Sequence, residues 1–321
     1  MAQIFSNDVE AADALKQAYA NLKKEIAKVV VGQDDVVRLV LTGIFCQGHS
    51  LLVGVPGLAK TLLVQTISTS LDLNFKRIQF TPDLMPSDIV GAETMDKERN
   101  FQFVKGPIFA NIILADEINR TPPKTQAALL ESMQEYAVTI AGKQYELPKP
   151  FFVLATQNPI EQEGTYPLPE AQLDRFMFNI WLDYPSYHQE VDIVKNTTAD
   201  DVKKVNKVLT AEEIVTFQHL VRRVPVADNV VEYAVKLSQA TRPGAQGTKV
   251  ANDYLEWGAG PRASQYLVLG AKCNALINGK YSPDIEDVQA VARPVLRHRI
   301  VRNFKAEAEG MSVDSLIEKL L

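Results

Sequence analysis

The sequence predicts an α/β domain built on a parallel five-stranded sheet, followed by an all-helical domain. Short, continuous apolar segments alternate with helical patterns up to about residue 184, which is typical of parallel strands covered by helices on both faces. A glycine-containing loop follows the first of these segments, at residues 54–61. From residue 186 onward the apolar residues recur at helical spacing. We therefore expect residues 1–184 to form an N-terminal helix and an α/β core, and residues 185–321 to form a helical domain.

The predicted elements follow one another in a regular order. Before the sheet we expect helices at 8–29 and 34–47. The strands are expected at 50–53, 74–80, within 108–114, at 151–155 and at 178–182, with a helix at 61–71. Two inserted hairpins are expected at 91–106 and 137–147. In the second domain we expect helices at 187–197, 211–222, 228–241, 262–278, 284–296 and 312–320. We also expect N-caps at Thr210 and Asp284, and a loop at 244–260.

The composition narrows the possible classes of function. Hydrophobic residues make up 46% of the 321 residues and charged residues 23%, with a net charge of −5. This acidic balance disfavours a protein that acts mainly by binding nucleic-acid backbone. The only cysteines, Cys46 and Cys273, are far apart in the sequence, so neither a disulfide framework nor a zinc site is expected. No apolar run is long enough for a membrane helix and no targeting segment is recognised, so the expected location is the cytoplasm.

The loop after the first strand has the pattern of a phosphate-binding loop. Backbone N–H groups of such a loop bind phosphate oxygens, and the following helix directs its positive end at the same charge. Lys60 would reach the β- and γ-phosphates, and Thr61 would place its hydroxyl on Mg²⁺. Ala59 stands where such loops usually have glycine, which matters if the position needs a positive φ. Because a helix start accepts alanine, we expect the loop to be retained.

Polar residues follow two of the later strands. Asp116 and Glu117 end the third strand, where an aspartate can hold Mg²⁺ and a glutamate can polarise the attacking water. Asn158 follows the fourth strand and could orient that water against the γ-phosphate. An alternative for Asn158 is that it simply forms a turn before Pro159. The combination predicts a Mg²⁺-dependent ATPase.

Taken together, these motifs resemble the MoxR-type AAA+ ATPases, close to the chelatase group with an insert in helix 2. The resemblance covers nearly the whole chain and rests, beyond residues 54–61, on the segments 114–126, 155–159, 170–176 and 260–263. The family implies an AAA+ core and a helical lid assembled into a ring, usually a hexamer. It also implies work on partner proteins, often with von Willebrand factor A domains, in maturation or metal-cofactor insertion.

The resemblance assigns further roles by position. Arg175 matches the arginine finger that reaches the nucleotide of the neighbouring subunit, and Arg262 matches the sensor 2 arginine, acting on its own or the neighbouring subunit. Asn158 matches sensor 1. Gln79 resembles a polar residue that some relatives use to restrain the catalytic glutamate. The residues expected to bind the nucleotide are Val30, Val31, Gly32, Gly54, Val55, Pro56, Gly57, Leu58, Ala59, Lys60, Thr61 and Leu62.

Three functions remain open from the sequence. An ATP-driven remodelling chaperone is favoured. A nucleotide-gated scaffold with little turnover and a chelatase- or helicase-like motor are the alternatives. The motor hypothesis depends on a basic stretch that contains Arg293, Arg297, His298, Arg299, Arg302 and Lys305. The favoured interpretation of this stretch is a solvated helical face.

Overall fold

The computed structural model describes residues 5–95, 97, 99–161, 164–198, 203–245 and 247–321. The chain forms two compact units, and each is discontinuous in sequence. Unit 1 contains the described part of Met1–Tyr19 together with Glu170–Asn179 and Thr216–Leu321. Unit 2 contains Ala20–Pro169 and Ile180–Val215. The division into domains at residue 184 stays a prediction.

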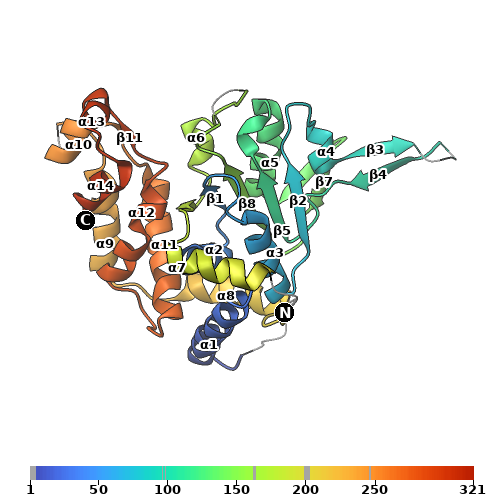
Figure 1. The fold of residues 1–321 in the computed structure, drawn as a ribbon, viewed down its shortest axis with the longest axis horizontal. Coiled ribbons are helices and arrows are strands. Elements are labelled where there is room, and N and C mark those ends of the chain that lie inside the picture. The colour runs from blue at the N-terminus through green and yellow to red at the C-terminus, as the bar shows by residue number, and fades with distance from the viewer. Residues whose placement is uncertain (1–4, 96, 98, 162–163, 199–202, 246) are drawn as a thin grey trace. The chain divides into compact units, whose positions relative to one another are not determined.

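A five-stranded parallel sheet forms the centre of unit 2, as the sequence predicts. The strands lie in the order β2-β5-β8-β1-β9. Because helices cover the sheet, the apolar strands β5 and β8 are almost wholly inaccessible, whereas the edge strand β2 exposes Lys76 and Arg77. The strands are β1 (Ser50–Val53), β2 (Phe75–Gln79), β5 (Ile112–Asp116), β8 (Phe152–Gln157) and β9 (Phe178–Trp181), which ends in unit 2 (Figure 1).

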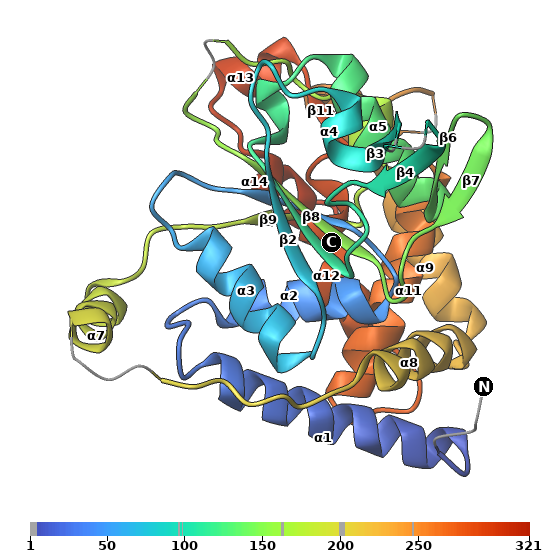
Figure 2. The same ribbon diagram turned by 90° about the vertical axis from the view of Figure 1, so that its right-hand side faces the viewer.

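The helices of unit 2 connect these strands and cover them. The helix α3 (Lys60–Ser70) follows the phosphate loop and packs against β2 and β5 (Figure 2). The expected third strand begins later than the apolar run suggests, because residues 108–111 form a turn whose backbone bonds to neighbouring loops. The other helical segments of unit 2 are α2 (Asp34–Phe45), α4 (Pro86–Val90), η1 (Ile118–Arg120), α5 (Pro123–Glu135) and α7 (Tyr187–Thr198).

Both predicted hairpins are confirmed. The first pairs β3 (Gly91–Met95) with β4 (Phe101–Lys105), and Figure 1 shows it projecting away from the sheet of unit 2. The second pairs β6 (Ala137–Ile140) with β7 (Lys143–Glu146) through a turn at Ala141 and Gly142.

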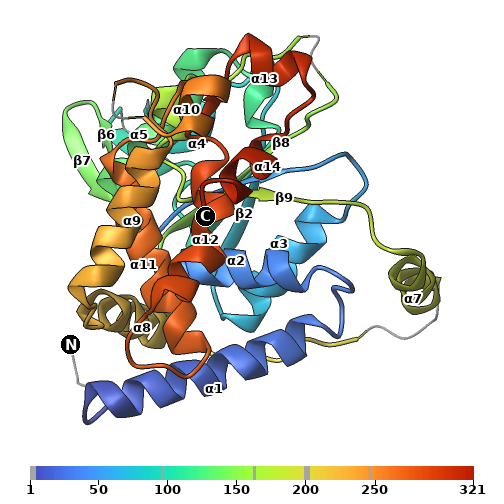
Figure 3. The ribbon, with the colours of Figure 1, turned by 90° about the vertical axis from the view of Figure 1, so that its left-hand side faces the viewer.

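Unit 1 is predominantly helical. Its centre is the packing of α11 (Pro261–Ile277) against α9 (Asp228–Ala240) and α12 (Ile285–Leu296) (Figure 3). The side chain of the predicted cap Asp284 accepts a hydrogen bond from the backbone N–H of Asp287, and the backbone N–H of Asp284 donates to the Asp287 side chain, which completes a capping box. The shorter helices are α10 (Lys249–Tyr254), α13 (Phe304–Ala308) and α14 (Val313–Glu318).

Two helices have residues in both units. They are α1 (Asp8–Ile26) and α8 (Ala211–Arg223). The predicted N-cap of α8, Thr210, accepts a 3.3 Å hydrogen bond from the backbone N–H of Glu213, so that cap is confirmed.

The expectation that residues 244–260 form a loop, with no strand in the second half of the chain, is wrong. Thr248 caps α10 by accepting a hydrogen bond from the backbone N–H of Ala251. The next residues form β10 (Leu255–Trp257), which pairs antiparallel with β11 (Val301–Arg302). Strands this short carry too little alternation to be recognised from the sequence.

Among the described residues, no helix has the length and apolarity needed to cross a membrane.

Candidate active site

The polar residues of the site meet at one edge of the sheet in unit 2. In the parallel register Gln79 lies opposite Asp116, and Val53 opposite Gln157. Because parallel strands end on the same side, the loop after β1 and the side chains that follow β5 and β8 gather there. The sequence-predicted residues Lys60, Thr61, Asp116, Glu117 and Asn158 all belong to unit 2.

Lys60 begins α3 and lies close to both carboxylates. Its ammonium donates a hydrogen bond to the carbonyl of Gly54, which closes the loop on itself. Partial burial lowers the pKa of Lys60, and the negative charges of Asp116 and Glu117 oppose that shift. A cation placed in this way can bind phosphate oxygens at the start of the helix.

Ala59 occupies a left-handed backbone conformation, with φ 53° and ψ 32°. The expectation that this position is an ordinary helix start is therefore wrong. The loop must turn sharply into α3, and this turn is made in the region that favours glycine. Gly57, with φ 87°, makes the other left-handed turn of the loop. The loop thus keeps its shape with alanine at a strained position.

Asp116 is held from two sides. The guanidinium of Arg77 donates to its Oδ2, with Nη2 at 2.6 Å and Nε at 3.0 Å. The hydroxyl of Thr156 donates to its Oδ1 at 2.6 Å. Mg²⁺ would therefore meet a carboxylate whose orientation is already fixed.

Glu117 is also held, and its backbone is strained. It adopts a left-handed conformation with φ 58° and ψ 48°, and its N–H donates to the hydroxyl of Thr156 at 2.8 Å. Its Oε2 accepts hydrogen bonds from Gln79 at 2.8 Å and from Arg120 at 3.1 Å. Strain of this kind is common where a catalytic group must point away from its strand. The family resemblance suggested that Gln79 restrains Glu117, and the hydrogen bond between these two side chains is present.

Asn158 is buried directly after β8, with an exposed fraction of 7%. Its Oδ1 accepts a hydrogen bond from the backbone N–H of Ile160 at 3.2 Å, which is the turn predicted as the alternative. That bond fixes the side chain at the sheet edge, beside β5. The turn and the water-orienting role are therefore compatible.

A cavity of about 380 Å³ lies among the loop, residues 29–33 and residues 183–197. It is lined by the predicted adenine-contacting residues Val30, Val31 and Gly32, and by Pro56, Gly57, Leu58, Ala59 and Leu62 from the loop and α3. Gln33 also lines it, and its buried Oε1 has no hydrogen-bond partner among the described residues. An unpaired acceptor in a mostly apolar pocket fits the amino group of a purine.

The site also fits Mg²⁺ held together with phosphates. Mg²⁺ is usually bound by one or two carboxylates, water and substrate phosphates. Asp116 and the hydroxyl of Thr61 would supply the protein ligands. Elsewhere in the described part of the chain, no group of three or more His, Cys, Asp or Glu side chains is arranged to hold a metal ion.

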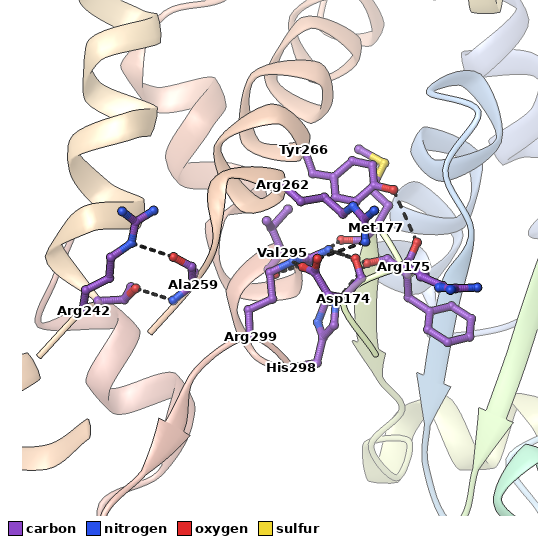
Figure 4. Close-up of polar contacts among 12 residues, drawn as sticks. Asp174, Arg175, Met177, Arg242, Ala259, Arg262, Tyr266, Val295, His298 and Arg299 are labelled. Atoms are coloured by element: carbon purple, nitrogen blue, oxygen red, sulfur yellow. Dashed lines mark hydrogen bonds and ion pairs between the residues drawn. The ribbon is translucent and has the colours of Figure 1, made fainter. Parts of the chain in front are cut away.

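The two predicted arginines belong to unit 1. Arg262 opens α11, and its Nη1 donates to Oδ2 of Asp174 at 3.0 Å. Arg175 is the next residue after Asp174, and the Asp174 carboxylate lies beside Arg262 and Arg299 (Figure 4).

The solvated-face interpretation of the basic stretch 293–305 is wrong for two of its members. His298 and Arg299 are buried, and Arg299 is bound to Asp174. The exposed Arg293 is paired with Glu318 and the half-buried Arg297 with Asp314. These pairings leave little cationic surface to attract a nucleic acid.

Sequence reasoning missed the residues that hold the candidate catalytic groups and the two predicted arginines. These are Arg77, Arg120 and Thr156 in unit 2, and Asp174 and Arg299 in unit 1. For Arg77 a signal exists, since it lies two residues before Gln79 and alternation places both on one face of β2. Arg120 is only three residues from Glu117, so the turn at η1 brings the two together, whereas Thr156, Asp174 and Arg299 reach their partners only through the tertiary fold.

Comparison with known families finds two matches that follow the architecture. Residues 49–178 match the ATPase family associated with various cellular activities (AAA). Residues 248–320 match the AAA lid domain. The first match contains the phosphate loop and both carboxylates, and the second contains Arg262.

Individual relatives agree over most of the chain. The chaperone MoxR1 of Mycobacterium tuberculosis is 42% identical, covering 92% of this chain and 79% of that protein. The Bacillus subtilis protein YeaC, which is uncharacterized, is 40% identical, covering 93% of this chain and 91% of that protein. A crystal structure from Cytophaga hutchinsonii, of a protein provisionally described as an ATPase, is 43% identical with a TM-score of 0.90, covering 97% of this chain and 95% of that one.

Proposed function

Because the chain belongs to the MoxR-type AAA+ ATPases, we propose that it couples Mg²⁺-dependent ATP hydrolysis to the remodelling of a partner protein. The observation that carries the proposal is the position of Lys60 close to Asp116 and Glu117 at one edge of the sheet, directly after the loop that lines the cavity of about 380 Å³. A phosphate-binding cation, a metal-binding carboxylate and a base are the groups that phosphoryl transfer to water requires.

Each side chain has a separate task in this proposal. Lys60 and the backbone N–H groups of residues 54–61 bind the phosphates, while Thr61 and Asp116 hold Mg²⁺. The metal, when bound, would neutralise charge on the β- and γ-phosphates. Glu117 takes a proton from the attacking water, and Asn158 orients that water.

The arginines complete the site in an assembly. We expect a ring, as is usual for AAA+ proteins and most often a hexamer, in which Arg175 reaches the nucleotide of the neighbouring subunit. Arg262 would stabilise phosphate charge from the lid, in its own subunit or the next. A planar guanidinium can bind two phosphate oxygens at once, which suits charge developing on the γ-phosphate.

The partner is expected to be a protein. A relative named as a chaperone supports this general role. Proteins with von Willebrand factor A domains, and maturation or metal-cofactor insertion in the cytoplasm, are the specific candidates. The pairing and burial within residues 293–305 disfavour a nucleic-acid motor.

The test compares ATP turnover and partner capture for the wild type and Glu117→Gln. Loss of the base should abolish turnover while nucleotide binding persists, so the variant should retain ATP and hold its partner. In parallel, Arg175→Ala should abolish turnover without loss of nucleotide binding, and full turnover of Arg175→Ala would contradict the role in the ring. Equal turnover of the wild type and Glu117→Gln would contradict the catalytic assignment.

One observation favours a second candidate, a nucleotide-gated scaffold that hydrolyses ATP slowly. Glu117 is engaged by Gln79 and Arg120 at the same oxygen, so in this state it is not free to approach a water. Slow basal turnover that rises on addition of a partner would favour the chaperone, whereas slow turnover under all conditions would favour the scaffold.

A further inference from the structure

Arg299 is a buried clamp in unit 1, and its side chain is 1% exposed. Every N–H of its guanidinium has an acceptor. Nε donates to Oδ1 of Asp174 at 2.8 Å, and Nη2 donates to the carbonyls of Asp174 at 2.8 Å and Phe176 at 2.7 Å. Nη1 donates to the carbonyls of Met177 and Val295. All but one of these bonds hold the segment that contains Arg175.

The whole backbone of residues 174–177 is fixed in the same way. The one carbonyl that Arg299 does not reach, that of Arg175, accepts a hydrogen bond from the hydroxyl of Tyr266 at 3.3 Å. The ring of Tyr266 also lies against the Arg299 guanidinium, 5.2 Å from its centroid. His298 donates from Nε2 to the carbonyl of Phe176 at 2.9 Å. Side chains therefore attach this segment to α11 and to the residues that directly follow α12 (Figure 4).

Asp174 extends this clamp to Arg262, the candidate sensor 2 arginine. Its Oδ1 accepts from the buried Arg299, and its Oδ2 accepts from Arg262, which is 39% exposed. Burial of a charged guanidinium is costly unless it is paired and fully hydrogen-bonded, and Asp174 supplies that pairing. A single carboxylate thus joins a rigid internal cation to a more exposed one.

We propose that Arg299, acting through Asp174, is the positioning residue that keeps the two candidate charge-stabilising arginines in one fixed arrangement. Arg175 is fixed through its backbone and Arg262 through its side chain, so both move as one body with α11 and α12. Neither Arg299 nor Asp174 is required to touch the nucleotide. The proposal rests on the roles given above to Arg175 and Arg262.

The decisive variants weaken the clamp without removing either arginine. Asp174→Asn keeps the size of the side chain but removes the charge that pairs with Arg262. Arg299→Lys keeps the charge but removes the planar fork. Tyr266→Phe removes a single hydroxyl. The matched control is Arg293→Lys, because Arg293 lies on α12, is half exposed and pairs only with Glu318 among the contacts described.

Steady-state turnover with Mg-ATP is measured for each variant, with the melting temperature and the fraction assembled as checks on folding. For Asp174→Asn and Arg299→Lys we expect kcat to fall between about tenfold and a hundredfold, as for a charge displaced by about 1 Å. KM should change less than about twofold, because uniform nucleotide binding is untouched. Tyr266→Phe should lower kcat less, and Arg293→Lys should match the wild type.

A second measurement separates positioning from a purely structural role. Asp174→Asn is added to a protein that already carries Arg262→Ala but keeps Arg175. If Asp174 acts through Arg262, the substitution should lower turnover less in this background than in the wild type, since effects of residues that act as a unit are not additive.

Each outcome decides something. A folded Asp174→Asn or Tyr266→Phe with wild-type kcat, or a rise in KM alone, would overturn the positioning role. If Arg299→Lys fails to fold, the other two variants decide. The proposed function fails separately, when the wild type and Glu117→Gln show the same turnover. The inference alone fails when turnover needs Glu117, Arg175 and Arg262 but not Asp174.

Discussion

The side-chain amide of Gln79 donates a 2.8 Å hydrogen bond to the carboxylate of Glu117. Removing this donor in Gln79→Leu should raise basal ATP turnover, because Glu117 then has one restraint fewer on its way to the attacking water. A hydrogen bond to a charged group contributes about 1.5 kcal/mol, so the increase should reach at most about tenfold. Turnover without added partner, measured by phosphate release, checks this.

The control for that variant is Gln144→Leu, which alters an exposed glutamine on the hairpin strand β7 in the same unit. It should leave turnover unchanged. Slower turnover in Gln79→Leu would show instead that Gln79 holds Glu117 in its working orientation.

If Asp116 holds Mg²⁺ as proposed, Arg77 should compete with the metal for this carboxylate. In Arg77→Gln the carboxylate loses a neighbouring positive charge, so half-maximal turnover should need less Mg²⁺. Arg77 is 47% exposed, and solvent screening limits such a pair to about 1 kcal/mol, which corresponds to at most about a fivefold shift in Mg²⁺ concentration. Lys76→Gln removes the same charge from the other face of β2 and should leave the Mg²⁺ curve in place. A higher Mg²⁺ requirement in Arg77→Gln would contradict the competition.

The left-handed Ala59 predicts that Ala59→Gly stabilises the protein. Glycine removes the steric strain of the positive φ in the folded state, but it also gives the unfolded chain more conformational entropy. The first effect should be larger, so the free energy of unfolding should increase by about 0.5–1 kcal/mol. Chemical denaturation measures it. Ala127→Gly, in the exposed interior of α5, should have the opposite sign and cost about 1 kcal/mol. Equal losses in both variants would mean that position 59 carries no strain.

His49 makes unit 2 sensitive to acid. Its Nδ1 accepts from the N–H of Val153 at 3.0 Å, and its Nε2 donates to the carbonyl of Met133 at 3.0 Å, so the folded state needs the neutral ring. Burial is the main cause that lowers the pKa of His49 from 6.5 to about 4. Between pH 6.5 and pH 4, His49 is protonated in the unfolded chain but neutral in the folded protein. The free energy of unfolding is therefore highest above about pH 6.5 and falls as the pH approaches 4.

The loss should total about 3 kcal/mol, and urea unfolding at several pH values measures it. The pKa of His298 is also lowered by burial, so it adds to the loss in the same direction. His49→Gln should flatten the pH dependence, whereas His188→Gln, at an exposed position, should not. An equally steep dependence in His49→Gln would exclude His49 as its source.

The sheet and its chemistry could be predicted because both depend on short segments. β1 begins and ends where its apolar run does, and the loop, Asp116 and Asn158 each follow a strand directly. Their meeting at one edge follows from parallel order alone. The third strand was expected only somewhere within 108–114, and it begins at Ile112 because residues 108–111 form a turn.

The rest depends on contacts between distant segments. Nothing near Arg299 in the sequence indicates that it binds Asp174, and no pattern shows that Thr156 joins Asp116 to the backbone of Glu117. The backbone angle of Ala59 is likewise set by the turn into α3, so residue type alone suggested an ordinary helix start.

Unit 1 is closed by segments from opposite ends of the chain. Asp8 accepts two hydrogen bonds from Arg223, and Asp13 accepts one from the hydroxyl of Tyr281. On the ribosome, the sheet of unit 2 has all its strands once β9 has emerged, but the first half of α1 must wait for α8, α11 and α12. The site for the phosphates can therefore form during synthesis, while the body that carries Arg175 and Arg262 is completed later. The order of translation would thus delay a hydrolysis-competent state until the helices that carry Arg262 and Tyr281 have been synthesised.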